Sequence, residues 1–226
     1  MLTKKSLPNL VTLTMGVVAS IAILLIGLGQ DLLAIRLVFL ALSLDVLDGY
    51  LARKLNATSD KGALLDRLFD RLYQVIVPVI IYLKLTSGSI LSIIYGAVLI
   101  TVSYWRIAEV KPSSAWFTGL PLNIHTLVII SSYLSKLVIP PAVMLLLLVP
   151  TLLPIKYAKR LGEPGQSTNK GTFWQIRLVV PLILAFMPYD EITWFFYLLL
   201  SLAFAYVLVG WIPPWMWARR KGTNQY

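Results

Sequence analysis

The sequence predicts an all-α fold, a polytopic transmembrane helical bundle with six to eight spans and both termini in the cytoplasm. Hydrophobic residues occupy 58% of the 226 positions, and the mean hydropathy is +0.79. Charged residues occupy only 13%, whereas an ordinary soluble domain has about 25%. Apolar runs recur along the whole chain at about 20 residues, the length that crosses a bilayer. We therefore expect an integral membrane protein.

Eight apolar segments are candidate spans, separated by turns or polar loops. Glycine and polar residues place turns at 29–31 and 86–89 and a polar loop at 156–172. The seventh segment is short, and little more than Pro140 and Pro141 separates the fifth from the sixth. Six long spans with a re-entrant or tilted pair is therefore the alternative count. The candidate spans are residues 9–29, 32–54, 62–84, 88–108, 118–136, 138–155, 174–188 and 191–216.

The first of these segments follows a basic start that contains Lys4 and Lys5. A cleaved signal peptide begins in the same way, but no small-residue cleavage pattern follows the apolar run. We expect a first span that is retained. Because neither a soluble segment of domain size nor a sequence repeat is visible, we expect residues 1–226 to form a single integral-membrane domain.

The charges fit a topology with positive residues inside. With the N-terminus in the cytoplasm, alternation through eight spans leaves only Arg36, Lys84 and Lys136 as basic residues on the outer side. The net charge of +10 is then explained by topology and anionic lipids, and nucleic acid is not expected as a partner. The chain has no cysteine, which excludes disulfides and thiolate metal sites. The inner connections and their flanks carry Lys4, Lys5, Arg53, Lys54, Lys61, Lys111, Lys156, Lys159, Arg160, Lys170, Arg177, Arg219, Arg220 and Lys221.

Five aspartates lie between residues 45 and 70, within and between the second and third candidate spans. Asp45 and Asp48 are three residues apart, and Asp66 and Asp70 are four apart, so each pair lies on one face of its helix. Carboxylates at membrane depth are costly and mark functional sites. Two such helices facing each other would gather four carboxylates around one cavity. Because like charges repel at these spacings, a divalent cation would stabilise them, and oxygen ligands suit Mg²⁺, Ca²⁺ or Mn²⁺.

Two other interpretations of the aspartate cluster stay open. Carboxylates in a transporter can form a cation or proton pathway, but transporters often carry paired broken helices in both halves, and no second acidic cluster matches this one. A charge-neutral cluster of salt bridges is the other alternative, because five basic residues balance the five aspartates. These basic residues are Arg53, Lys54, Lys61, Arg67 and Arg71.

The aspartates belong to a longer pattern with small residues and one arginine. This pattern resembles the signature of the CDP-alcohol phosphatidyltransferase family, in which two aspartates, a glycine, an alanine–arginine pair, a second glycine and two more aspartates follow at fixed gaps. Every position is present, with eight residues between the arginine and the second glycine. The resemblance is strong over the second and third spans and extends loosely to the rest through the family's helical-bundle architecture. The matching residues are Asp45, Asp48, Gly49, Ala52, Arg53, Gly62, Asp66 and Asp70.

The resemblance implies a reaction of phospholipid biosynthesis in which an alcohol hydroxyl attacks the lipid-side phosphorus of a CDP-linked lipid and CMP leaves. By resemblance, four aspartates hold one or two Mg²⁺ or Mn²⁺ ions, and the last of them, Asp70, also takes the proton from the alcohol. The implied metal ligands are Asp45, Asp48, Asp66 and Asp70. The residues implied to bind the CDP-lipid are Gly49, Ala52, Arg53 and Gly62, of which the arginine meets a phosphate. Small residues in membrane helices also mark close helix packing, and both roles are compatible.

The start of the first span adds two residues to the implied nucleotide site. Pro8, Asn9 and Thr12 are similar to the Pro-Asn-x-x-Thr start that is common in the family. The resemblance places Asn9 and Thr12 on the CDP-lipid, and an N-terminal helix cap is the alternative. His125, the one histidine of the sequence, is expected to hydrogen-bond between helices rather than to catalyse.

One segment, Phe-Thr-Gly-Leu-Pro at 117–121, bears on the identity of the acceptor alcohol. It resembles the Phe-x-Gly-Leu-Pro segment of phosphatidylserine synthases, which implies L-serine as the acceptor. The serine carboxylate would need a cation, for which Arg106 and Lys111 are the candidates. Those synthases usually continue with another proline and small residues, whereas Asn123 and His125 follow here. Bacterial phosphatidylcholine synthases have a similar Phe-x-Gly-Phe-Pro segment.

Other acceptors would make other demands on the same region. Inositol phosphate or glycerol phosphate would need several basic residues together. Choline would need an aromatic cage, although tryptophan and tyrosine are also ordinary residues of membrane interfaces. The aromatic candidates are Tyr104, Trp105, Trp116 and Phe117.

The location of the aspartate pattern and the resemblance also predict the membrane setting, the assembly and the lipid substrate. The aspartate pattern straddles an inner connection, so the active site should face the cytoplasm. The expected setting is a prokaryotic cell membrane, and the expected assembly is a homodimer by resemblance. The lipid substrate is a CDP-lipid with either diacyl or archaeal ether tails, and the bilayer itself is a partner.

Overall fold

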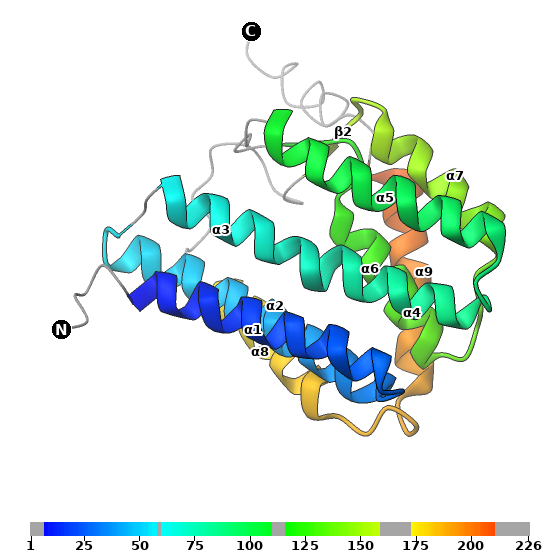
Figure 1. Ribbon diagram of the computed structural model, residues 1–226, viewed down its shortest axis with the longest axis horizontal. Helices are drawn as coiled ribbons and strands as arrows, with labels where there is room; N and C mark the ends of the chain where they lie inside the picture. The colour runs from blue at the N-terminus through cyan, green and yellow to red at the C-terminus, as the bar shows by residue number, and fades with distance from the viewer. Residues whose placement is uncertain (1–6, 58–59, 110–115, 159–172, 211–226) are drawn as a thin grey trace, which may run out of the picture.

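The computed structural model describes residues 7–57, 60–109, 116–158 and 173–210. These residues form a bundle of helices with one short two-stranded sheet. Figure 1 shows long rods stacked side by side, with α9 crossing behind α6. The predicted all-α fold class is confirmed.

The N-terminal half of the bundle is made of long helices. α1 spans Leu7–Gly27 and α2 spans Asp31–Lys54. The next rod is continuous and consists of α3 (Asp60–Arg71), a π-helical turn η1 (Leu72–Ile76) and α4 (Val77–Leu85), as Figure 1 shows. α1 packs along α2 and also contacts α3, which brings the two aspartate-bearing helices to the same side of α1.

The second half contains shorter helices. α5 packs on α7, α6 on α9, and α8 on α2. The strands pair antiparallel, with Phe117 opposite Tyr157. The elements are α5 (Ile90–Glu109), β1 (Trp116–Thr118), α6 (Leu122–Leu134), α7 (Pro141–Leu152), β2 (Lys156–Ala158), α8 (Phe173–Phe186) and α9 (Thr193–Val209).

Helix lengths leave the predicted number of spans unconfirmed. Within the described residues, only Leu7–Gly27 and Ile90–Ala108 are both long and apolar enough to cross a membrane. The predicted fifth span, 118–136, and sixth span, 138–155, are wrong in their bounds, because they are helical only over Leu122–Leu134 and Pro141–Leu152. Helices of 13 and 12 residues are only about 20 Å long, whereas the hydrocarbon core is about 30 Å thick.

Prolines explain why these two helices begin late. Pro121 and Pro140 are the residues immediately before α6 and α7, and both have extended ψ angles of 137° and 140°. Proline has no backbone N–H and fixes φ near the helical value, which suits the start of a helix but not its interior. The residues before each proline are therefore excluded from the helix, and part of the predicted fifth span forms β1 instead.

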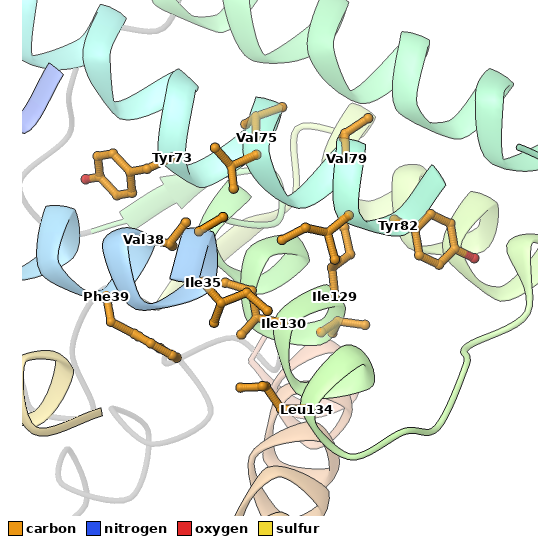
Figure 2. Close-up of a cluster of buried hydrophobic side chains, with 14 of the residues drawn as sticks. Ile35, Val38, Phe39, Tyr73, Val75, Val79, Tyr82, Ile129, Ile130 and Leu134 are labelled. Carbon is orange, nitrogen blue, oxygen red and sulfur yellow. The ribbon is translucent and has the colours of Figure 1, made fainter. Parts of the chain in front are cut away.

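The core lies where α2, the rod η1–α4 and α6 meet. Figure 2 shows Ile35 and Val38 of α2 on one side of this core and Val75 and Val79 of the rod on the other, with Ile129 of α6 beside them. All five side chains are buried. Their burial fixes the rod that carries Asp66 and Asp70 against the helix that carries Asp45 and Asp48.

Close packing of α1 on α3 depends on one glycine. A Cβ atom built on Gly16 would lie only 2.8 Å from the ring of Phe69. Phe69 lies between Asp66 and Asp70 on α3, so the missing side chain of Gly16 permits α1 to approach the helix of the site. Small residues serve the same purpose in many membrane helix pairs.

Polar contacts fix the end of α2 that is remote from the aspartate pairs. Lys84 Nζ lies 2.5 Å from Asp31 Oδ1. Arg36 places its guanidinium 5.2 Å from the ring centroid of Tyr189 and donates to the carbonyl of Met187 at 3.3 Å. These contacts join α2 to α4 and to the connection between α8 and α9.

We predict that Gly16→Ala destabilises the protein by about 1–3 kcal/mol relative to Gly27→Ala, because the new methyl group overpacks the ring of Phe69. Gly27 is the matched control, since it ends the same helix and a Cβ there meets nothing within 4 Å. Thermal unfolding of the purified variants in detergent measures the difference. Equal unfolding midpoints for the two variants would contradict the packing of α1 on α3.

Candidate metal and catalytic site

Three of the four motif aspartates converge. Asp45 and Asp48 lie near the end of α2, and Asp66 lies on α3. Each offers one carboxylate oxygen, and the three oxygens all lie within 4.8 Å of one another. The spacing along the helices accounts for this, because the i,i+3 pair of α2 faces the first carboxylate of the i,i+4 pair of α3.

Asp48 is held by a side chain from a third helix. Thr12 Oγ1 of α1 donates to Asp48 Oδ2 at 2.6 Å and also lies 3.1 Å from the carbonyl of Pro8. Thr12 and Asp48 are both buried. The hydroxyl therefore fixes one oxygen of the carboxylate.

Asp66 lacks a hydrogen-bond partner for one of its oxygens. Within the described residues, Asp66 Oδ1 is buried and accepts no hydrogen bond. A buried polar atom without a partner is costly, and a cation would satisfy it. The donor set consists only of carboxylate oxygens, which suits Mg²⁺, Mn²⁺ or Ca²⁺. The residues therefore fit a divalent ion.

Asp70 lies beside this group but outside it. It is one turn further along α3, and it interacts electrostatically with Asp45, Asp48 and Asp66. Its Oδ1 accepts a hydrogen bond of 2.8 Å from the hydroxyl of Tyr73. Asp70 is thus not one of the three converging carboxylates, and its hydrogen-bond donor comes from η1.

The π-helical turn η1 begins directly after this segment of α3. The N–H of Val77 donates to the carbonyl of Leu72, the i→i−5 bond that defines the wider turn. Turns of this kind are rare inside α-helices and are frequent at functional sites. Here the turn contains Tyr73, and it begins two residues after Asp70.

The small residues of the motif lie around the end of α2 and the start of α3. A Cβ on Gly49 would lie 3.4 Å from Nη1 of Arg53, so the arginine side chain folds back along the helix beside this glycine. Arg53 is exposed and interacts electrostatically with Asp48. Ala52 and Gly62 are half-buried. This surface beside the carboxylates stays a predicted site for the CDP-lipid.

Asn9 and Thr12 differ in their surroundings. Asn9 is exposed, whereas Thr12 is buried against Asp48. Neither residue is the helix N-cap, because α1 already begins at Leu7 and the Thr12 hydroxyl donates to oxygen atoms. The capping alternative is wrong, and Thr12 has a contact within the carboxylate site that the sequence did not predict.

Among the described residues, no salt bridge to the aspartates of the cluster is found. The two salt bridges found among the described residues, Lys84–Asp31 and Lys136–Asp190, lie elsewhere. Arg177 of α8 interacts electrostatically with Asp45. Arg177 is more than 100 residues from Asp45 in the sequence, and no sequence pattern predicted that the two residues interact.

Arg106 holds the segment 117–121 in place. Its Nη1 donates to the carbonyl of Leu120 at 2.9 Å, and its Nη2 donates to the carbonyl of Thr118. Gly119, between these two carbonyls, has φ of +74°, and a Cβ there would lie 2.6 Å from the carbonyl oxygen of Thr151. Glycine is therefore required for both conformation and space. A guanidinium has five N–H groups, and these two bonds use two of them, which leaves three.

The other residues predicted to contact the acceptor differ in their exposure. Tyr104 and Trp105 are exposed on α5, and Phe117 is half-buried in β1. Lys111 and the side chain of Trp116 lie outside the described residues. These aromatic side chains thus have different exposures, and they stay candidates.

His125 connects three helices, as expected. Tyr95 of α5 lies 2.9 Å from its Nδ1, and Thr151 of α7 lies 2.8 Å from its Nε2. The Thr151 hydroxyl donates to the carbonyl of Leu147, so it accepts from His125 Nε2–H, and Nδ1 accepts from Tyr95. The imidazole is buried and its two nitrogens are used, which is a structural role.

Comparison with known proteins supports the resemblance. The family model described as CDP-alcohol phosphatidyltransferase matches residues 5–154, which is more than half of the chain. The chain belongs to this family. No curated protein matches it. The matched region contains all four motif aspartates and the segment 117–121.

We predict that Thr12→Val weakens Mn²⁺ binding by about tenfold or more, because residues that orient a metal ligand typically contribute 10- to 100-fold to affinity. Thr14→Val is the control, since Thr14 lies on the same helix and donates only to the carbonyl of Leu10. Isothermal titration of the purified protein with Mn²⁺, without nucleotide, measures the effect. Unchanged Mn²⁺ affinity together with weaker CMP binding would instead assign Thr12 to the nucleotide.

Proposed function

We propose that this member of the CDP-alcohol phosphatidyltransferase family transfers a phosphatidyl, or ether-lipid phosphatidyl-like, group from a CDP-lipid to L-serine and releases CMP. The family itself implies transfer of a phosphatidyl group from a CDP-alcohol to an acceptor, a step of phospholipid biosynthesis. The observation that carries the metal-dependent form of this proposal is the convergence of three carboxylate oxygens from two helices within 4.8 Å.

Asp45, Asp48 and Asp66 hold one or two divalent ions, Mg²⁺ or Mn²⁺, in this proposal. The orphaned Oδ1 of Asp66 supports it, since that buried oxygen otherwise accepts no hydrogen bond within the described residues. A divalent ion bound there supplies neutralisation of the charge on the diphosphate. Displacement at a diphosphate requires little else from the protein apart from positioning of the two substrates.

Asp70 is the general base in this proposal, in addition to its predicted role as a metal ligand. Its separation from the three converging carboxylates supports a separate task. One carboxylate oxygen of Asp70 takes the proton of the acceptor hydroxyl while the acceptor oxygen bonds to the lipid-side phosphorus. The bond from that phosphorus to the bridging oxygen breaks, and CMP leaves with the electron pair. A base must lie within hydrogen-bond reach of the proton that it takes.

The nucleotide part of the CDP-lipid binds beside the end of α2. Gly49, Ala52 and Gly62 provide close approach, and Arg53 pairs with a phosphate. Asn9 is exposed at the start of α1 and contacts the same nucleotide, together with Thr12. The lipid tails, diacyl or ether, extend along the apolar outer faces of the bundle.

L-serine is the proposed acceptor because of the segment 117–121 and the cation that holds it. Arg106 keeps three N–H groups that its bonds to the carbonyls of Thr118 and Leu120 do not use, so a carboxylate can still pair with it. Lys111 is the second proposed cation. Choline, inositol phosphate and glycerol phosphate are the alternative acceptors for the same reaction.

The membrane placement follows from the sequence pattern. We propose six to eight spans, both termini and the active site on the cytoplasmic side, and a homodimer in a prokaryotic cell membrane. The basic residues near the inner ends of the segments support this orientation. An all-helical chain with many exposed apolar side chains is consistent with a membrane protein of this family. Membership of this family disfavours the transporter alternative.

We predict that Asp70→Asn abolishes CMP release from a CDP-lipid while Mn²⁺-dependent CMP binding is partly retained. The amide cannot accept the proton, but the three converging carboxylates stay intact. Radiolabelled CMP release measures turnover, and titration calorimetry measures binding. Undiminished turnover of the variant would refute the assignment of Asp70 as the base. Asp190→Asn is the control, since this exposed carboxylate lies beyond the site.

The acceptor is tested with radiolabelled serine, choline, inositol phosphate and glycerol phosphate, each offered with CDP-diacylglycerol and with an ether-lipid analogue. We expect labelled lipid from serine, and we expect EDTA to abolish its formation and added Mg²⁺ or Mn²⁺ to restore it. Product from another acceptor alone would replace serine while retaining the reaction. Activity that survives complete chelation would remove the metal from the mechanism.

A further inference from the structure

Tyr73 is a buried tyrosine whose hydroxyl the family signature does not include. Its side chain is 0% exposed, and the hydroxyl donates to Asp70 Oδ1 at 2.8 Å. Figure 2 shows the ring beside α2 with the hydroxyl pointing away from Val75 and Val79. The hydroxyl also interacts electrostatically with Asp45. It therefore points from the apolar core toward the carboxylates.

A second side chain fixes the direction of this hydrogen bond. Gln74 Nε2 lies 3.0 Å from the Tyr73 hydroxyl oxygen and donates to it. A phenol has one proton. Because the hydroxyl oxygen already accepts from Gln74, its proton is directed to Asp70. Gln74 is held in turn from α6, where the hydroxyl of Thr126 donates to its backbone carbonyl.

We propose that Tyr73 is a positioning residue for Asp70, and this inference rests on the proposed function. The hydroxyl engages Oδ1 and holds the carboxylate plane, so that Oδ2 is the oxygen that takes the proton of the acceptor alcohol. The π-helical turn η1 places Tyr73 and Gln74 in succession beside Asp70, and Thr126 fixes the turn to α6. A chain of hydrogen-bonded residues from Thr126 of α6 through η1 thus sets the orientation of the Asp70 carboxylate on α3.

The geometry assigns Tyr73 a role that packing alone does not explain. A phenylalanine would fill the same apolar space, but it would leave Asp70 free to rotate about its side-chain torsions. Orientation of reacting groups contributes strongly to rate, and small misplacements cost up to about 100-fold. Replacing Tyr73 with phenylalanine should therefore lower the rate of the chemical step rather than weaken the binding of either substrate.

The test compares Tyr73→Phe with Tyr82→Phe in the full-length protein in detergent–lipid micelles. Tyr82 is the matched control, because it is also buried on the same rod and donates to the carbonyl of Ile139 at 2.7 Å, far from the carboxylates. We expect Tyr73→Phe to lower kcat for CMP release about 10- to 100-fold with KM for both substrates within about twofold of the wild type. Mn²⁺ affinity, measured by titration without substrate, should fall less than in Thr12→Val, because Asp70 stands outside the three converging carboxylates. Tyr82→Phe should keep the wild-type kcat.

Equal kcat values for Tyr73→Phe and wild type would overturn the proposal, as would an equal loss in Tyr82→Phe. If Tyr73→Phe does not yield folded protein by gel filtration, Gln74→Met decides the question. This variant removes the donor that directs the Tyr73 proton, so a lower kcat at unchanged KM supports the proposal, and an unchanged kcat overturns it.

Asp70→Asn in the same assay separates this inference from the proposed function. A wild-type protein that releases no CMP with any acceptor refutes the proposed function itself. A wild type that is active, with Asp70→Asn inactive and Tyr73→Phe unaffected, refutes only the role of Tyr73.

Discussion

Like charges held together in one small volume are the constraint on which this molecule depends. Asp45, Asp48 and Asp66 bring carboxylate oxygens within 4.8 Å of one another, and the salt bridges found among the described residues lie elsewhere. Repulsion between such groups grows as water is excluded. The apolar core between α2, the rod η1–α4 and α6 holds the helices against this repulsion, and the contact of Gly16 with Phe69 permits α1 to close over them. These three carboxylates could hold a divalent cation, which would offset the repulsion.

Hydroxyl groups orient the carboxylates on both sides of this centre. Thr12 of α1 donates to Asp48, and Tyr73 of η1 donates to Asp70. Each donor engages one oxygen of its carboxylate. Helices beyond α2 and α3 therefore contribute contacts to the site or to the turn beside it. α1 contacts Asp48 through Thr12, and α6 contacts η1 through Thr126, although neither helix carries a motif aspartate.

The segment 117–121 is tied to the fold more tightly than a loop usually is. Arg106 donates to carbonyls on both sides of Gly119, and the N–H groups of Gly119 and Leu120 donate to the carbonyls of Ile155 and Pro150. The arginine and the glycine therefore have architectural reasons for their identity. The backbone of a segment held in this way is already ordered, so a ligand that binds against it would not have to order it.

The sequence by itself determined the all-helical class, the positions of the helical rods and the carboxylate pattern, because hydropathy and the 3.6-residue period are local properties. It also determined the family, since the model of the CDP-alcohol phosphatidyltransferase family matches residues 5–154. It did not determine the bounds of α6 and α7, where Pro121 and Pro140 begin the helices later than hydropathy indicates. Only the tertiary structure decided that Thr12 meets Asp48, that Arg177 approaches Asp45, and that Asp70 stands apart from the other three carboxylates. Contacts between distant segments depend on how helices pack and turn relative to one another, and no local pattern records this.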